Sequence, residues 1–158
     1  MLIRPLTPAD VPAIHALEVE AYLPSLHESA EAFMRLIEIY PDGAFGGFDE
    51  DGLCGYAFGV PLKAGTTLEL QSPLAAVPAD ADTFYIHDVA VAARCRGEGV
   101  GRILASRLVE LARARGFRQS ELVSVQGSAP FWEKFGFRET RRFDYAPGAP
   151  SVKMTVRF

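Results

Sequence analysis

Two positions near the middle of the chain carry side chains suited to acid–base chemistry. His87 can gain and lose a proton near neutral pH, and Tyr85 stands two residues before it. The surrounding run, residues 84–92, is rich in β-branched residues and predicts a strand. A histidine whose hydrogen bonds are satisfied within the core is the alternative interpretation. Strict alternation along the strand puts Tyr85, His87, Val89 and Val91 on one face, and Ile86, Asp88 and Ala90 on the other.

A basic, glycine-rich turn follows this strand and has the composition of an anion site. Residues 94–101 read RCRGEGVG, and an amphipathic helix comes next. Glycines let the main chain approach a ligand closely. The first turn of a helix adds unpaired N–H groups and the positive end of the helix dipole. The spacing therefore predicts that a phosphate binds here.

The turn departs from two common phosphate-binding patterns. A dinucleotide fingerprint needs glycine at 102 or a small residue at 104, where the chain has Arg102 and Leu104, and no P-loop run occurs. Seven arginines stand between positions 94 and 118 against two glutamates, in a chain of net charge −4. Positive potential is thus concentrated beside the turn, and Arg94, Arg96 and Arg102 are predicted to supply it. An ordinary strand-to-helix connection is the alternative.

The remaining segments predict one mixed α/β domain over residues 1–158, long enough to bury a real core. The predicted element order is β-α-α-β-β-β-α-β-α-β-β. One right-handed crossover among antiparallel strands gives a mixed sheet with helices on both faces. Periodicity and turn signals place strands at 2–6, 44–48, 53–62, 84–92, 119–125, 137–145 and 152–158, and helices at 8–22, 29–39, after the glycine turn and from 128.

Two connecting segments are candidates for binding. The linker at residues 22–27 is rich in apolar and ring side chains, and it either forms the wall of a substrate site or staples two helices together. Residues 63–82 have weak pattern, and so long a connection is usually functional or mobile.

Composition excludes several classes of function. The acidic balance gives no support for nucleic acid as a partner. No apolar run is long enough for a membrane span and no secretory signal is visible, so we expect a cytoplasmic protein. Cys54 and Cys95 lack C-x-x-C spacing, so the sequence predicts no metal site and supports no disulfide. Cys95 lies in the glycine turn, either as a small filler or as a thiol of lowered pKa.

Two motifs resemble those of the GNAT superfamily of N-acetyltransferases. Arg96-x-x-Gly99-x-Gly101 resembles the superfamily's acyl-CoA pyrophosphate turn, and the run APFWEKFGF at 129–137 looks like its closing helix and turn. With the order of elements, the resemblance covers essentially the whole chain. It is greatest for the arylalkylamine N-acetyltransferase branch, in which a Glu-rich helix end, here Glu18 to Tyr22, precedes a proline-containing acceptor loop.

The resemblance implies the acyl-CoA N-acyltransferase fold, acetyl-CoA as donor and a primary amine of a small molecule as acceptor. His87 would be the general base, with Tyr85 beside it, and no metal would take part. Dimerisation is frequent in the superfamily, so a homodimer is an open expectation. The implied cofactor contacts are Val89 and Val91 along the acetyl-pantetheine arm, the N–H groups of Arg96, Gly97, Glu98, Gly99, Val100, Gly101 and Arg102 on the pyrophosphate, and Phe131 against the arm. The expected acceptor wall is Tyr22, Leu23, Pro24 and Trp132.

This chain departs from the family pattern at two positions. Tyr85 replaces a second histidine, so His87 acts alone or through water. Trp132 stands where many members have a proton-donating tyrosine, and indole cannot act as an acid at accessible pH. Tyr85, Ser128 or water are possible substitutes. Two other readings follow: an acyl-CoA-binding module without activity, or an enzyme acting on an amino acid, an antibiotic amine or a protein N-terminus.

Overall fold

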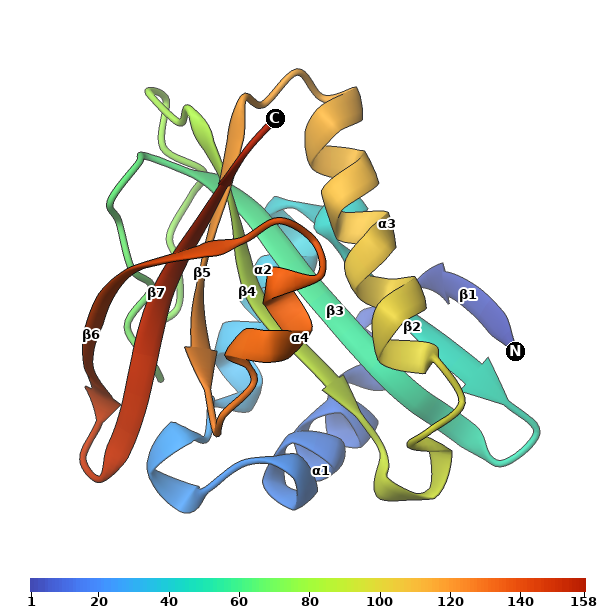
Figure 1. The fold of residues 1–158 in the computed structure, drawn as a ribbon. Coiled ribbons are helices and arrows are strands. Elements are labelled where there is room, and N and C mark those ends of the chain that lie inside the picture. The colour runs from blue at the N-terminus through green and yellow to red at the C-terminus, as the bar shows by residue number, and fades with distance from the viewer.

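A computed structural model describes residues 1–158 and confirms the predicted order of elements (Figure 1). The strands are β1 (Leu2–Pro5), β2 (Ala44–Asp49), β3 (Gly52–Leu62), β4 (Thr83–Val91), β5 (Gln119–Val125), β6 (Arg138–Ala146) and β7 (Ala149–Arg157). The helices are α1 (Val11–Ala21), α2 (Ala30–Ile39), α3 (Val100–Ala114) and α4 (Ala129–Glu133). Short 3-10 turns lie at Pro8–Asp10 (η1), Pro24–Leu26 (η2), Pro41–Gly43 (η3) and Ala93–Cys95 (η4).

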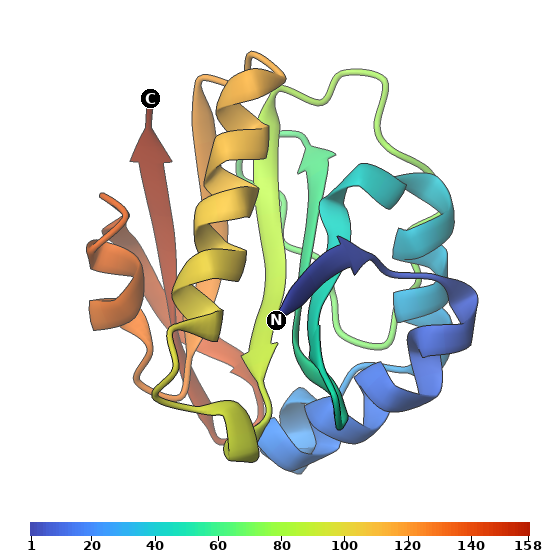
Figure 2. The ribbon, with the colours of Figure 1, turned by 90° about the vertical axis from the view of Figure 1, so that its right-hand side faces the viewer.

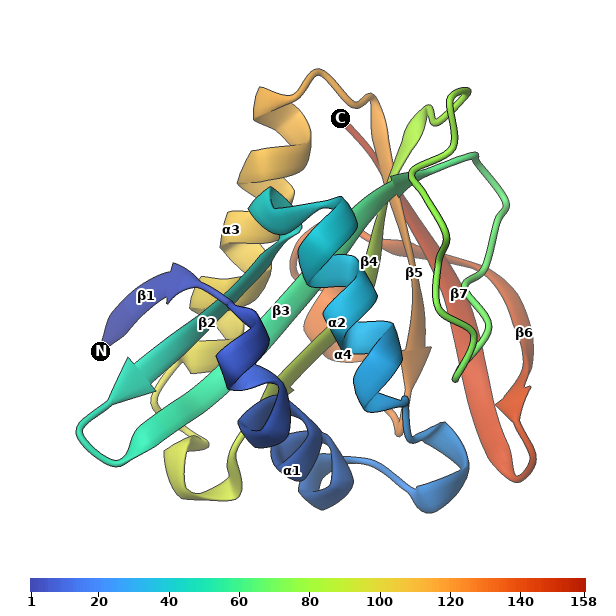
Figure 3. The same cartoon turned by 180° about the vertical axis from the view of Figure 1, so that it is seen from behind.

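The seven strands form one mixed sheet in the order β1-β2-β3-β4-β5-β7-β6. All neighbours are antiparallel except β4 and β5, which are parallel because α3 carries the chain back across the sheet. Helices α3 and α4 cover one face, and α1 and α2 cover the other, as the side view of Figure 2 and the rear view of Figure 3 show. The predicted mixed sheet covered on both faces is therefore confirmed. None of the helices combines the length and the apolar character that crossing a bilayer requires.

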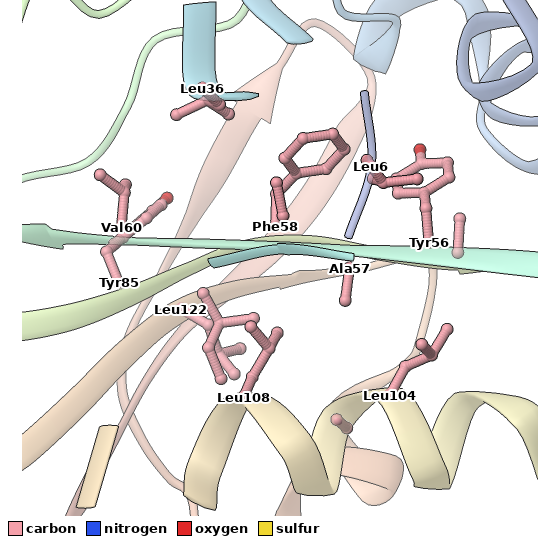
Figure 4. Packing of buried hydrophobic residues seen from close by; sticks show 14 of the residues in the cluster. Leu6, Leu36, Tyr56, Ala57, Phe58, Val60, Tyr85, Leu104, Leu108 and Leu122 are labelled. Atoms are coloured by element: carbon pink, nitrogen blue, oxygen red, sulfur yellow. The ribbon is translucent and has the colours of Figure 1, made fainter. Parts of the chain in front are cut away.

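Alternation along β3 divides the core between the two faces of the sheet (Figure 4). Tyr56, Phe58 and Val60 point toward α1 and α2, while Ala57 points toward α3, where Leu104 and Leu108 meet it. All six side chains are buried. Residues of the adjacent strand β4 face the same way as their partners on β3. Those opposite Tyr56, Phe58 and Val60 therefore face α1 and α2, and the residue opposite Ala57 faces α3.

A β-bulge interrupts β4 at His87. Phe58 pairs with Asp88 and the next residue, Gly59, pairs with Ile86, so His87 has no paired residue on β3. The extra residue turns Asp88 onto the face of α1 and α2. Val89, opposite Ala57, is turned toward α3. The predicted strict alternation is therefore wrong beyond His87: Val89 and Val91 lie on the opposite face from His87, and Asp88 and Ala90 lie on the same face.

Strands β4 and β5 remain paired over only a short distance. Their register joins Phe84–Ile86 to Ser120–Leu122 and then stops. Beyond this point the two strands diverge, with the bulge on β4 just past the last pair (Figure 1). This divergence opens a gap in the middle of the sheet. His87, Glu28 and Asp88 lie beside it.

Candidate active site

A cavity of about 300 Å³ occupies the split between β4 and β5. Its walls come from both strands, from the end of α1, from the segment around η2 and from α4. Of the residues predicted for the site, those that line it are Tyr22, His87, Val89, Val91, Arg96, Gly101, Phe131 and Trp132. The structure therefore brings the predicted base, part of the turn and the closing helix to one cavity.

His87 is paired with a carboxylate that the sequence did not single out. Its Nε2 lies 3.0 Å from Oε2 of Glu28, and the two side chains are only 3% and 4% exposed. The other ring nitrogen, Nδ1, is buried without a hydrogen-bond partner. Burial alone lowers the pKa of His87, but the hydrogen bond and charge of Glu28, with the charges of Asp88 and Glu18, raise it above its ordinary value overall.

Glu28 joins three separate segments. Its backbone N–H donates to the carboxylate of Glu18 on α1, and its Oε1 accepts the backbone N–H of Gln71. Gln71 has a left-handed backbone with φ of 58°, and its side-chain amide donates to the His27 carbonyl at 3.0 Å. In the sequence Glu28 only precedes Ser29, the cap of α2, so no local signal marked it as part of the site.

Two further carboxylates lie close to this pair. Asp88 accepts hydrogen bonds from the hydroxyls of Tyr22 at 2.6 Å and Tyr56 at 2.8 Å. Burial raises the pKa of Asp88, and the charge of His87 and the two hydroxyl donors offset only part of this effect. Burial also raises the pKa of Glu18 to about 7, and its Oε2 has no hydrogen-bond partner. The three carboxylates create a site that favours a proton or a cation.

Tyr85 lies beside His87 but does not line the cavity. The two ring centroids are 6.2 Å apart, and Tyr85 is 1% exposed. Burial raises the pKa of its hydroxyl well above the ordinary value. Lys153 Nζ stands 5.1 Å from the centroid of the Tyr85 ring. Tyr145, and not Tyr85, forms part of the cavity wall. This position suits packing against His87 better than proton donation to a ligand.

The glycine turn forms a second hollow that adjoins the first. Gly97 and Gly99 have φ of 83° and 82°, a region that favours glycine, and α3 begins at Val100. A Cβ on either residue would meet nothing within 4 Å, so the main chain there faces open space. The hollow is lined by Val91, Cys95, Arg96, Gly97, Gly99, Val100, Gly101, Arg102, Ser106, Phe131, Lys134 and Phe135. Glu98 is exposed and does not line it.

Only two of the three arginines predicted for the turn line the hollow. Arg96 and Arg102 do so, whereas Arg94 forms a bidentate ion pair with Asp49 at 2.7 and 3.0 Å. The prediction for Arg94 is therefore wrong. Its guanidinium is already engaged by a carboxylate from the β2–β3 hairpin, a contact between distant parts of the chain.

The predicted acceptor wall is only partly assembled. Tyr22 and Trp132 line the cavity, but Leu23 and Pro24 do not, and Leu23 is 49% exposed. Leu26 of the same linker lines the cavity. The linker thus contributes to the wall through Tyr22 and Leu26, and Leu26 packs against Ala146 and Ala149 of β6 and β7. Ser128 lines the cavity as well, and its hydroxyl lies 2.8 Å from that of Ser124 instead of capping α4.

The split mixed sheet and the glycine turn at the start of α3 are the features of an acyl-CoA N-acyltransferase fold, which confirms the predicted fold class. A sequence model of the acetyltransferase (GNAT) family matches residues 11–137. The chain therefore belongs to this family.

Individual relatives support the family and the fold. Glucosamine 6-phosphate N-acetyltransferase of Trypanosoma brucei brucei is 41% identical over 58 residues, which are 37% of this chain and 40% of the relative. The match thus spans about two-fifths of either protein. Neither this relative nor the family match supports the predicted arylalkylamine branch.

Two solved structures superpose over nearly the whole chain. The loading GNATL domain of CurA from Lyngbya majuscula has a TM-score of 0.85 at 14% identity, covering 99% of this chain and 96% of that one. The GphF GNAT-like decarboxylase in complex with isobutyryl-CoA has a TM-score of 0.81 at 19% identity, covering 99% of each chain. At these identities the likeness shows the fold alone.

Proposed function

We propose that this protein transfers an acetyl group from acetyl-CoA to a primary amine of a small molecule, with His87 as the general base. The observation that carries the proposal is the buried Glu28–His87 pair, which faces a cavity adjoining the glycine turn. A core histidine needs no charged partner and no cavity. Here the histidine has both, and its free nitrogen has no partner within the protein.

The glycine turn suits the diphosphate of coenzyme A. The N–H groups of residues 97–102, at the start of α3, donate to no backbone acceptor, and an anion is favoured there. The N–H of Arg96, predicted to join them, instead donates to the Ala93 carbonyl at 3.3 Å. Val89 and Val91 line the cavity beyond the turn, and Phe131 belongs to both hollows. We therefore place the pantetheine arm along the split edge of β4, so that the thioester, which supplies the activated acetyl group, is presented toward His87.

His87 would act through Nδ1. An alkylamine with a pKa near ~10 is mostly protonated at neutral pH, so a base must remove a proton before nitrogen can attack. Nε2 is occupied by Glu28, and Nδ1 is the nitrogen left to accept that proton. Glu28 then stabilises the imidazolium, while Tyr85 holds the ring from the side. A thiolate is a tolerable leaving group, so water can supply its proton without the tyrosine that Trp132 replaces.

The charge and apolar lining of the cavity indicate a cationic acceptor with an apolar body. Glu28 and Asp88 line the cavity beside His87, and Leu26, Leu70 and Trp132 supply apolar surface. An aromatic alkylamine satisfies both requirements. Glucosamine 6-phosphate, for which the trypanosomal relative is named, carries an anionic group that Glu28 and Asp88 do not attract, which disfavours it.

Release of free coenzyme A from acetyl-CoA, measured with a panel of acceptors, tests the proposal. The panel contains aromatic alkylamines, amino acids, an aminoglycoside, glucosamine 6-phosphate and a peptide with a free N-terminus. We expect turnover with an aromatic alkylamine, and a loss of at least ~100-fold in kcat/KM for His87→Gln. His15→Gln changes a partly exposed histidine outside the cavity, 3.9 Å from Glu18, and should change the rate far less than His87→Gln does.

Two results would contradict the proposal. Unchanged turnover in His87→Gln removes His87 from its role. Binding of coenzyme A without turnover on any amine favours the alternative of an acyl-CoA-binding module.

A further inference from the structure

Two cysteines from distant parts of the chain meet at the base of the glycine turn. Cys54 lies on β3 and Cys95 in η4, and their Sγ atoms are 2.7 Å apart. Unbonded carbon atoms pack at ~3.5–4.0 Å, and sulfur atoms are larger than carbon, so the two sulfur atoms are unusually close. The distance is still longer than the ~2.05 Å of a disulfide bond. Both residues are buried as free thiols, at 2% and 1% exposed. Little movement separates the pair from covalent bonding.

The backbone holds the two thiols in place. The N–H of Ala92 donates to the carbonyl of Cys54 at 2.7 Å, and the N–H of Cys95 donates to the carbonyl of Ala92 at 2.9 Å. The pairing therefore does not depend on a mobile loop.

The surroundings distinguish the two sulfur atoms. Cys95 lines the hollow of the glycine turn, so a small oxidant entering it meets Cys95 first. Cys95 Sγ also lies 3.8 Å from Asp49 Oδ2, a carboxylate that Arg94 holds in its ionised form. Burial raises the pKa of Cys54 to about 12, which keeps Cys54 protonated until its partner is activated.

We propose that Cys54 and Cys95 are a reversible dithiol–disulfide pair, oxidised by a peroxide. The Cys95 thiolate attacks one peroxide oxygen, the O–O bond breaks, and Cys95 becomes a sulfenic acid while hydroxide, or an alcohol after protonation, leaves. Cys54 Sγ then attacks Cys95 Sγ, its proton leaves with the hydroxyl group as water, and the S–S bond forms. With hydrogen peroxide the balance is two thiols and one peroxide to one disulfide and two waters.

A metal is the competing use of this cluster. Asp49, Cys54 and Cys95 place their ligand atoms within 4.8 Å of one another. Both oxygens of Asp49 are engaged by Arg94, however, at 2.7 and 3.0 Å. The carboxylate of Asp49 is therefore already bound to Arg94. The close contact between the two sulfur atoms favours oxidation over metal binding.

Peptide mapping of the wild-type protein before and after hydrogen peroxide tests the inference. We expect both free thiols to disappear, a Cys54–Cys95 cross-linked peptide to appear without reductant, and dithiothreitol to reverse the change. The bond closes a loop between positions 54 and 95, so the oxidised protein should melt roughly 5–10 °C higher. Thiols that stay free, links between separate chains, or oxidation to sulfinic acid without a cross-link would each overturn it.

Single variants test the assigned order of the two sulfurs. In Cys54→Ser, Cys95 sulfenic acid should accumulate and be trapped by dimedone, whereas Cys95→Ser should give no adduct at Cys54. The reverse labelling would overturn the order. If a variant does not fold, the wild-type cross-link still decides the main point. None of these results depends on the proposed acetyl transfer, because neither acetyl-CoA nor an amine is present.

Discussion

His87 owes its chemical character to the residues around it. Among its neighbours are Glu28, Glu18 and Asp88, and the hydrogen bond to Glu28 fixes which ring nitrogen is free. A buried histidine without such neighbours has a lowered pKa and carries no charge. The carboxylates reverse that tendency, and this reversal can be measured in solution.

The charge of Glu28 should set the pH dependence of activity. His87 must be deprotonated to act, so kcat/KM rises as pH increases through the pKa of His87 in the free enzyme. Glu28 raises that pKa, and Glu28→Gln should therefore move the acidic limb to lower pH while reducing the plateau by about tenfold. The pH profile of kcat/KM measures both effects.

A matched substitution three residues further along the chain gives the control. Glu31→Gln changes an exposed glutamate in the first turn of α2 and should leave the limb where it is. An acidic limb that does not move in Glu28→Gln, or that moves to higher pH, would show that Glu28 does not tune His87.

Glu18 should make folding stability depend on pH. Its folded pKa of about 7 lies above the ordinary value of 4.5, so the folded protein binds this proton more tightly than the unfolded chain. Its contribution is therefore full below pH 4.5 and is lost as pH rises toward 7. Between pH 5 and 8 the free energy of unfolding should fall less in Glu18→Gln than in the wild-type protein. The difference should be about 1–2 kcal/mol. Urea denaturation across this range measures it, and identical slopes in both proteins would contradict the assignment.

Among the elements, β4 shows what sequence patterns can and cannot predict. The strand, the glycine turn and α3 follow from local residue types, and the structure confirms them within a few residues. The bulge at His87 does not, because it depends on the register of β3 across the sheet. Strict alternation consequently assigned Val89, Val91 and Asp88 to the wrong faces.

The same limit explains the other missed residues. Glu28 and Gln71 are separated by 43 positions, and their contact exists only once the segment 63–82 packs against the residues that precede α2. Arg94 was misplaced for the same reason, since Asp49 reaches it from another hairpin. Motifs contained within a few residues were readable from the sequence, whereas contacts between distant segments were not.

The segment 63–82 should support catalysis through one backbone N–H. Gln71→Pro removes the donor to Glu28 and forbids the φ of 58°, while Gln71→Gly keeps the N–H and permits that φ. We expect kcat to fall about tenfold in the proline variant with little change in KM for acetyl-CoA, and near wild-type kinetics for the glycine variant. Equal kinetics in both variants would exclude this role.

The glycine turn should require its left-handed residue for coenzyme binding. An alanine at Gly99 is strained at φ of 82° and disturbs the main chain at the start of α3. Gly116 has the same φ of 82° and the same open surroundings at the far end of this helix. Gly99→Ala should raise KM for acetyl-CoA about tenfold, whereas Gly116→Ala should lower only the melting temperature. A similar KM in the two variants would contradict the placement of the diphosphate.

Taken whole, the sheet consists of two parts joined by a short seam. Strands β1 to β4 form one part and β5, β7 and β6 the other, and the only register between them runs along Phe84–Ile86. The cavity lies where this seam ends, with the basic turn at one side of it. A ligand that fills the split contacts both parts, so the arrangement of the entire molecule, more than any one motif, creates the site.

Calorimetric titration of the wild-type protein with acetyl-CoA tests the central claim most directly, because every catalytic and coenzyme-binding role proposed above depends on that ligand occupying the split. The account predicts saturable heat with one site per chain and a dissociation constant between about 1 μM and 1 mM, the range common for enzyme substrates. No heat up to millimolar acetyl-CoA would contradict it.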